Sequence, residues 1–257
     1  MEYLYYLNHQ HFTSGDTRLA WNFAKTIINE NKDVDTITFL VYQQRHYESF
    51  LGEMNFSPKA IREYGFTLDN GFKIQIHTVQ TYRPSLYFVN EPKRELLIAV
   101  GVPPKDLEQF IDSSRVKYWI VVPWTLDENM SFLKIFEAVN IETGEKLAAN
   151  FVVDDTIKKA VTYLKSTSHP NEGYTHWSDE NSLKSMANAI STYNIPFDRD
   201  SLIHYCYYNG LTFDAAKKTA DYFDRAKKCQ FSIQDGSSPQ SLMNLLNSND
   251  FNEAFKS

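Results

Sequence analysis

The residues best suited to chemistry form one short run between an apolar strand and an amphipathic helix. Ser14-Gly15-Asp16-Thr17-Arg18 follows the strand and opens the helix. Backbone N–H groups and the positive end of a helix attract a phosphate or a carboxylate. Gly15 permits close approach, the hydroxyls of Ser14 and Thr17 donate, and Arg18 adds a fork of donors. The run therefore predicts a site for an anionic small molecule.

The same run has a plainer interpretation, which residue preferences favour. Asp16 is a preferred N-cap residue, and its carboxylate would repel a bound anion. The run also lacks the glycine spacing of a dinucleotide-binding loop and the lysine of a P-loop. A helix cap at Asp16 and an anion site that includes Arg18 are thus competing hypotheses.

Two histidines precede this run. His9 and His11 are two residues apart, so on a strand both imidazoles would lie on one face. A metal would need a third ligand, and none is near in the sequence, so we predict no metal site and keep His11 as a candidate for ligand binding. The triplets at 11–13 and 176–178 superficially resemble the paired motif of two-histidine phosphoesterases. The second triplet precedes a helix that Ser178 would cap, so we reject this resemblance.

Gly101 and Trp124 are the remaining candidates, and they come from a strand–helix–strand unit. The runs ELLIAVGV (95–102) and VKYWIVVPW (116–124) have no polar alternation, which is typical of parallel strands buried on both faces. Open α/β sheets bind ligands beyond the carboxyl ends of their strands, where Gly101 and Trp124 lie. For Trp124 the alternative is packing at the edge of the sheet.

A helix pair at 201–223 has the outline of a helix-turn-helix, with Gly210 in the turn. Asn209 falls where an apolar residue is usual, and residues 151–235 hold 10 Lys+Arg against 11 Asp+Glu. A balanced charge predicts a solvated amphipathic helix rather than a DNA-binding surface.

The overall composition limits the function classes. The 257 residues carry a net charge of −6, which argues against an electrostatic grip on nucleic acid or on an anionic membrane. The two cysteines lack CxxC or zinc spacing, so they form no disulfide framework. No window approaches 18 apolar residues, and no basic segment precedes the first apolar residues. We therefore expect a cytoplasmic protein.

Periodicity predicts the elements that position the candidates. A strand at 2–7, a helix at 16–31 and a strand at 36–42 open the chain as a β-α-β unit. Asp69-Asn70-Gly71 predicts a hairpin turn before a strand with one polar face. Further predicted elements are helices at 46–54, 57–64, 103–111, 126–139, 155–165, 178–193, 200–208 and 212–228, and a strand at 86–89.

These elements define the expected fold class and domains. We expect an α/β fold, with a Rossmann-like, mostly parallel sheet followed by a smaller all-helical domain. The α/β domain would span 1–150 and the helical domain 151–235. Residues 236–257, which open with Gly-Ser-Ser-Pro, would form a loosely ordered tail in which LMNLL could dock as a short helix.

The function that these expectations favour is binding of a small phosphate-bearing or nucleotide-like ligand at the strand carboxyl ends. A ligand-sensing regulator with a DNA-contacting helical part is one alternative. A protein-interaction module or homo-oligomer without a small-molecule site is another. No nucleophile elbow, HExxH or P-loop occurs in the sequence, so it names neither a reaction nor a cofactor.

Overall fold

The computed structural model describes residues 3–43, 65–67, 71–83, 94–113, 115–148, 150–233, 236–248 and 250–255. The chain forms two compact units, Met1–Ala149 and Asn150–Ser257. We call them the α/β unit and the helical unit.

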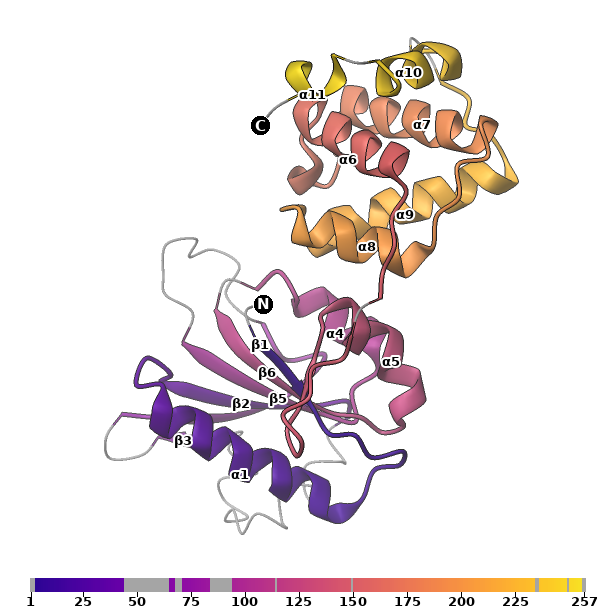
Figure 1. The fold of residues 1–257 in the computed structure, drawn as a ribbon. Coiled ribbons are helices and arrows are strands. Elements are labelled where there is room, and N and C mark those ends of the chain that lie inside the picture. The colour runs from indigo at the N-terminus through magenta and orange to yellow at the C-terminus, as the bar shows by residue number, and fades with distance from the viewer. Residues whose placement is uncertain are drawn as a thin grey trace. The chain divides into compact units, whose positions relative to one another are not determined.

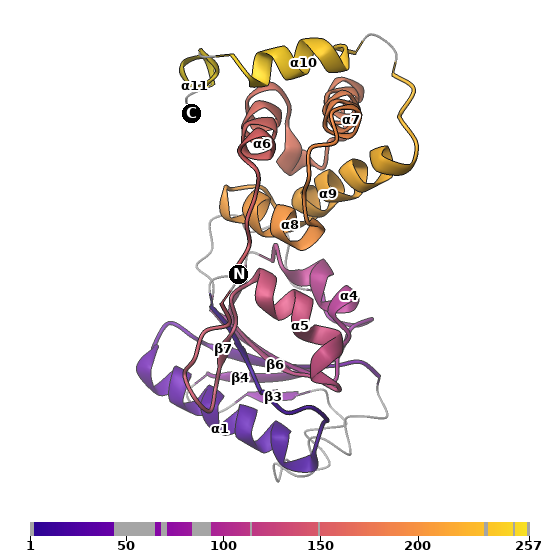
Figure 2. The same ribbon diagram turned by 45° about the vertical axis from the view of Figure 1, so that its right-hand side comes forward.

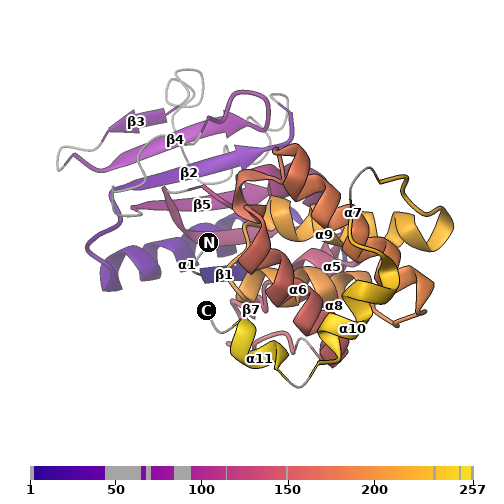
Figure 3. The ribbon, with the colours of Figure 1, turned by 90° about the horizontal axis from the view of Figure 1, so that it is seen from above.

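A seven-stranded sheet is the centre of the α/β unit (Figure 1). Its strand order is β3-β4-β2-β5-β6-β1-β7, and only β3 and β4 pair antiparallel (Figure 3). This order confirms the α/β class with a mostly parallel sheet, while the position of β1 beside β7 differs from the order of dinucleotide-binding folds. The strands are β1 (Tyr3–Tyr6), β2 (Thr36–Val41), β3 (Gly65–Thr67), β4 (Lys73–Thr78), β5 (Glu95–Val100), β6 (Val116–Val122) and β7 (Val139–Asn140).

Helices cover both faces of the sheet, which is why the apolar runs have no polar face. Every residue of β2 and β5 is buried. α1 (Ser14–Glu30) lies on one face, and α4 (Pro104–Leu107) and α5 (Leu126–Ile135) lie on the other (Figures 1 and 2). Ala20, Ala24 and Ile27 of α1 share a core with the side chains of one sheet face. The short 3-10 helix η1 (Glu108–Phe110) continues α4.

The region after α5 differs from the prediction. A helix was expected as far as Val139, but α5 ends at Ile135 and Val139–Asn140 forms β7. Glu137 has a φ of 50°, which ends the helix. The β7 strand pairs with β1, and the Ile141 N–H donates to the Tyr6 carbonyl at 3.0 Å, so the edge of β1 is covered.

Several predicted elements lie outside the described residues. They are the helices at 46–54 and 57–64, the strand at 86–89, and Asp69 and Asn70 of the hairpin turn.

The helical unit contains no strand among residues 150–233, 236–248 and 250–255. Four of its helices begin with a side chain that accepts a backbone N–H, as the sequence pattern predicts for Asp, Ser and Thr caps: Asp154, Asp198, Thr212 and Ser238. The elements are α6 (Asp155–Thr167), η2 (Pro170–Glu172), α7 (Trp177–Thr192), α8 (Arg199–Tyr208), α9 (Phe213–Lys228), α10 (Pro239–Leu246) and α11 (Phe251–Ala254).

Residues 239–246 and 251–254 form two helices with buried apolar side chains, where the sequence predicts a loosely ordered tail with LMNLL docked as a short helix. Leu242, Met243 and Leu246 of α10 are buried, as is Phe251 of α11. Lys159 of α6 donates to the Leu246 carbonyl at 2.8 Å. The sequence LMNLL places these apolar side chains on one side of α10, and their burial offsets the entropy of ordering the segment.

None of the described helices combines the length and the apolar character that crossing a membrane requires.

Candidate functional site

The strand ends of the α/β unit create one position where a ligand could bind. β1 and β6 are parallel neighbours. The chain leaves β1 towards α1 on one face and leaves β6 towards α5 on the other (Figure 2). Open α/β sheets commonly bind ligands at such a switch point, outside the carboxyl ends of the strands. We call this position the carboxyl-edge site.

An exposed indole is the most prominent feature of the carboxyl-edge site. Trp124 follows β6, is 51% exposed, and stacks on Phe12 with ring centroids 5.4 Å apart and an interplanar angle of 7°. Gly101 follows β5 with a φ of 61°, and a Cβ there would lie 3.3 Å from Trp124 Cε3. The glycine therefore gives the indole room beside the backbone. We call Phe12 and Trp124 the aromatic shelf.

Backbone hydrogen bonds fix the aromatic shelf in place. The Phe12 N–H donates to the Trp124 carbonyl at 3.0 Å, and the Leu126 N–H donates to the Gln10 carbonyl at 3.2 Å. Between these two bonds, His11 pairs with Thr125 as an isolated antiparallel bridge, and the His11 side chain is exposed. The loops after β1 and β6 thus form one rigid surface that carries three of the predicted site residues, His11, Gly101 and Trp124.

Two buried side-chain oxygens near the start of α5 have no hydrogen-bond partner among the described residues. Thr125 is the N-cap of α5 but makes no side-chain capping bond, and its Oγ1 has no hydrogen-bond partner among the described residues. Asn129 donates through Nδ2 to the Thr125 carbonyl at 3.1 Å, while its Oδ1 has no such partner there. A buried polar atom left in this state costs about 1–3 kcal/mol, so a water or a ligand atom would be stabilised beside it.

His9 joins two carboxylates next to the shelf. Its Nδ1 lies 2.8 Å from Asp16 Oδ1, and its Nε2 lies 3.1 Å from Glu142 Oε2. The hydrogen bond with Asp16 raises the pKa of His9, and Glu142 acts in the same direction against the opposing effect of burial. Both ring nitrogens face acceptors, so the imidazolium is the favoured form. No sequence pattern indicates this cluster, because Glu142 approaches His9 through the β1–β7 pairing.

The predicted anion loop already holds a carboxylate of its own. The N-cap of α1 is Thr13, not Asp16 as predicted, and Asp16 is the third helical residue of a capping box. The Asp16 carboxylate is 2% exposed and accepts the Thr13 N–H at 2.9 Å and the Thr13 hydroxyl at 2.6 Å. Its negative charge occupies the positive end of the helix.

The other four predicted residues lie in the first turns of α1. Ser14 is the first helical residue, and Gly15 and Arg18 are exposed. Thr17 is fully buried, and its Oγ1 has no hydrogen-bond partner among the described residues. The predicted candidates therefore lie in two places. One group lies at the strand ends, and the other lies at the start of α1, where the Asp16 carboxylate already offsets the positive charge of the helix end.

A second polar cluster, which the sequence did not reveal, is buried at the other end of β5. Glu95 is 2% exposed and accepts hydrogen bonds from the Thr38 hydroxyl and, at 2.9 Å, from the Tyr82 hydroxyl. Arg115 Nε lies 3.5 Å from its other oxygen. Burial raises the pKa of Glu95, and burial together with Glu95 raises that of Tyr82. A paired, fully bonded carboxyl of this kind stabilises a unique strand register, which is the plainer role for it.

A pocket of about 500 Å³ lies beside the carboxyl end of β4. It is lined by Val79, Gln80, Tyr82 and Arg83 and by residues of α4 and η1. Arg83 is exposed and donates to the Tyr82 carbonyl at 2.8 Å. The volume of the pocket is within the range of small-molecule sites. The guanidinium gives the α/β unit a second cation, besides Arg18, that could pair with an anionic group.

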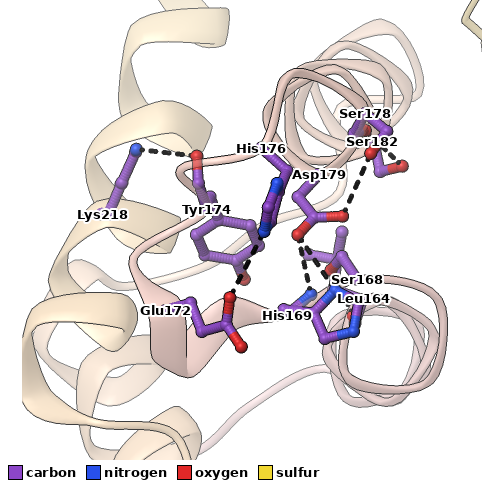
Figure 4. Close-up of polar contacts among 10 residues, drawn as sticks. All are labelled: Leu164, Ser168, His169, Glu172, Tyr174, His176, Ser178, Asp179, Ser182 and Lys218. Atoms are coloured by element: carbon purple, nitrogen blue, oxygen red, sulfur yellow. Dashed lines mark hydrogen bonds and ion pairs between the residues drawn. The ribbon is translucent and has the colours of Figure 1, made fainter.

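The most extensive polar cluster of the helical unit surrounds the start of α7 (Figure 4). Asp179 is buried and accepts the His169 backbone N–H at 3.0 Å, and its Oδ2 lies 3.3 Å from the His169 ring. His176, not Ser178 as predicted, is the N-cap of α7 and lies 3.4 Å from Glu172. The histidines 11 and 176 lie in different units and on no pair of strands, as the rejected phosphoesterase motif would need.

The predicted helix-turn-helix corresponds to α8 and α9, with Gly210 at a φ of 89° in the turn. Its basic side chains have partners inside the unit. Lys218 donates to the Gly173 carbonyl at 2.8 Å, and Lys227 lies 3.2 Å from Asp224. These contacts reduce the positive charge that α9 presents to a phosphate backbone.

Comparisons with known proteins yield no relative of this chain. No protein-family model, curated protein or solved structure matches it. Among the described residues, no group of three or more His, Cys, Asp or Glu side chains could hold a metal ion. The class that the fold defines is an α/β protein with a helical carboxyl-terminal part.

Proposed function

We propose that the α/β unit binds a small nucleotide-like ligand at the carboxyl-edge site. The observation that carries the proposal is the exposed Trp124 indole, held by Phe12 and by the glycine at position 101 where the β1 and β6 connections part. A planar ring would stack on the exposed indole, and such stacking contributes about 1–3 kcal/mol per base. The exposed His11 side chain would supply a polar contact at the rim.

The phosphate part of the ligand depends on cations rather than on the α1 start. Asp16 already neutralises that helix end, so Arg18 is the group of the predicted loop that would pair with a phosphate. The Arg18→Ala variant should then bind about ten- to a hundredfold more weakly, because charged hydrogen bonds contribute about 1.5–3 kcal/mol. If the Arg18→Ala variant binds with unchanged affinity, the loop at 14–18 is not part of the binding site, and the proposal is restricted to the aromatic shelf.

A thermal-shift panel of nucleosides, nucleotides and dinucleotides tests the main proposal. A ligand at 100 times its dissociation constant should add about 2.7 kcal/mol of stability. Trp124→Ala should abolish the shift. The matched control is Tyr3→Ala, because Tyr3 is 47% exposed and stacks on Tyr118 at 5.0 Å, but lies at the opposite end of β1. No shift with any compound at millimolar concentration would overturn the proposal.

The alternative of a DNA-contacting helical unit has one supporting observation, the α8–α9 geometry. A gel shift with random duplex DNA at low salt tests it, since non-specific binding is strongest there. Absence of binding at about 50 mM salt would end this alternative.

We also propose that the protein works in the cytoplasm. Both cysteines are free thiols, Cys206 buried and Cys229 exposed, which suits a reducing compartment. Fractionation of cells that express the tagged full chain tests this, and recovery outside the cytoplasm would overturn it.

A further inference from the structure

A small cavity in the helical unit has a lining unlike that of the carboxyl-edge site. It lies between α7, α6 and α10, and its volume is about 190 Å³. Tyr163 of α6, Leu242 of α10 and Trp177 of α7 form its apolar walls. Ser178, Ser182 and Ser185 of α7 are also among its lining residues. We call it the serine pocket.

The three serines form a row along one side of α7. They occupy positions i, i+4 and i+7, which share one helix face and span about 10 Å of the axis. Figure 4 shows Ser178 and Ser182 side by side on that helix. The Ser182 hydroxyl donates to the Ser178 carbonyl at 3.0 Å, and the Ser178 hydroxyl lies 3.4 Å from Asp179 Oδ1. Each hydroxyl that donates in this way still has lone pairs for a ligand.

Ser185 is the serine of this row whose hydroxyl lacks a hydrogen-bond partner among the described residues. It is 2% exposed, and its Oγ has no hydrogen-bond partner among the described residues. Gly236 packs against it so closely that a Cβ there would lie 2.5 Å from Ser185 Oγ. A buried hydroxyl that lines a cavity and lacks a partner marks a place where a ligand or a water completes the hydrogen bonding.

The size and charge of the cavity narrow the choice of ligand. A dry cavity of about 150 Å³ holds one benzene ring, whereas drug-sized ligands need about 300 Å³ or more, so the serine pocket fits a single ring. Of the described residues that line it, none carries a formal charge. A phosphate or carboxylate would lack a counter-charge there, and its desolvation would oppose binding.

We propose that the serine pocket binds one neutral sugar ring. A pyranose carries hydroxyls around its whole rim, which suits a row of hydroxyls over two helical turns. Its C–H faces are apolar, which suits contact with Trp177, Tyr163 and Leu242. A nucleobase has its hydrogen-bonding groups along one edge and fits this row less well. The proposal is independent of the carboxyl-edge site, which lies in the other unit.

Nuclear magnetic resonance on the full chain tests the proposal directly. Trp177 is the only tryptophan of residues 150–257, so its indole N–H signal, assigned with Trp177→Phe, reports on this pocket alone. The probes are D-glucose, D-galactose, D-mannose and N-acetyl-D-glucosamine, with uridine and inorganic phosphate as comparison. We expect a saturable shift of the Trp177 signal with at least one sugar and none with phosphate. No sugar response, or a tighter response to uridine, would overturn the proposal.

Two variants separate binding from folding. Ser185→Ala should weaken sugar binding about tenfold, while the melting temperature without sugar stays equal or rises, because an unpaired buried hydroxyl is removed. Ser182→Phe should fill the pocket and abolish the response. The control Ser191→Ala removes a hydroxyl of the same helix that donates to the Ala226 carbonyl at 2.8 Å, and binding should stay unchanged. A sugar response that survives both pocket variants would overturn the assignment to this cavity.

Discussion

The two units satisfy their buried polar groups in different ways. In the α/β unit, the backbone pairs along the sheet, and the polar side chains cluster with one another at strand ends, as His9 does with Asp16. In the helical unit, buried polar side chains bond to the backbone as well as to one another, as Tyr174 does with Thr219. Thr219 donates to the Ala215 carbonyl at 2.9 Å, and Asn188 exchanges two bonds of 2.8 Å with the backbone of Phe231.

This difference follows from where each kind of element leaves its backbone groups. A strand ends in a loop, and open α/β sheets bind ligands outside the carboxyl ends of their strands, where such loops lie. A helix satisfies its own backbone except at its termini, so a polar side chain between helices needs a local partner. Ser185 lacks one among the described residues, which makes the serine pocket unusual within its unit, whereas Trp124 is exposed where an α/β fold commonly places ligands.

The largest expected effect tests whether the units are separate folding units at all. Phe39 and Phe223 are fully buried, one in each unit, and truncation of either to Ala should cost about 3–5 kcal/mol. In calorimetry, Phe39→Ala should lower the transition of the α/β unit, and Phe223→Ala that of the helical unit. If either variant moves both transitions equally, the two units unfold as one.

The next effect tests backbone satisfaction in the helical unit. Asn188→Ala removes the partner of both the N–H and the carbonyl of Phe231, so we expect a loss of about 2–4 kcal/mol. Urea unfolding measures it. The control Gln230→Ala, whose exposed side chain donates to Thr192, should change stability by less than about 0.5 kcal/mol. Equal losses in the two variants would contradict the account.

A smaller loss should follow from opening the capping box in the α/β unit. Asp16→Ala removes the acceptor for Thr13 and His9, and we expect a cost of about 1–2 kcal/mol. The control is Asp127→Ala in the first turn of α5, where the side chain is exposed. Urea unfolding measures the free energy of unfolding of both variants. If Asp16→Ala leaves that free energy unchanged, the capping box does not stabilise the start of α1.

The pH dependence of stability gives a sharper view of His9. Its pKa is raised in the folded protein, so its contribution is fully present below about pH 6.5 and is lost as the pH rises through the higher folded value. The ring is 33% exposed, so we expect no more than about 1 kcal/mol. The unfolding free energy of the native chain minus that of His9→Gln should fall between about pH 6 and pH 9. A difference that grows with pH would refute the assignment.

The smallest effect concerns the glycine of the predicted anion loop. A Cβ at Gly15 would meet nothing within 4 Å, and its φ is not positive. Gly15→Ala should therefore stabilise the protein by about 0.4–1 kcal/mol. Calorimetry checks the stability, and a nucleotide titration shows whether a ligand needs the open position. If Gly15→Ala destabilises the protein, the added methyl group meets a steric clash at the start of α1 that the structure does not show.

Much of the fold could be predicted because the evidence for it is local. The unbroken apolar runs of β2, β5 and β6 predict strands buried on both faces, whatever their neighbours. Asp and Thr caps predict the starts of α6, α8 and α9 within one or two residues. The β7 strand could not be predicted, because it has only two residues and is defined by its pairing with the edge of β1, which is distant in the sequence.

The carboxyl-edge site was predictable in position but not in composition. By itself the sequence determined that Gly101 and Trp124 follow buried strands, because a strand and its end are local properties. Only the tertiary structure brought Phe12 onto Trp124, Glu142 onto His9, and Gly236 onto Ser185, because each pair is joined by strand order or helix packing. Side chains distant in sequence meet through topology, which no local pattern encodes.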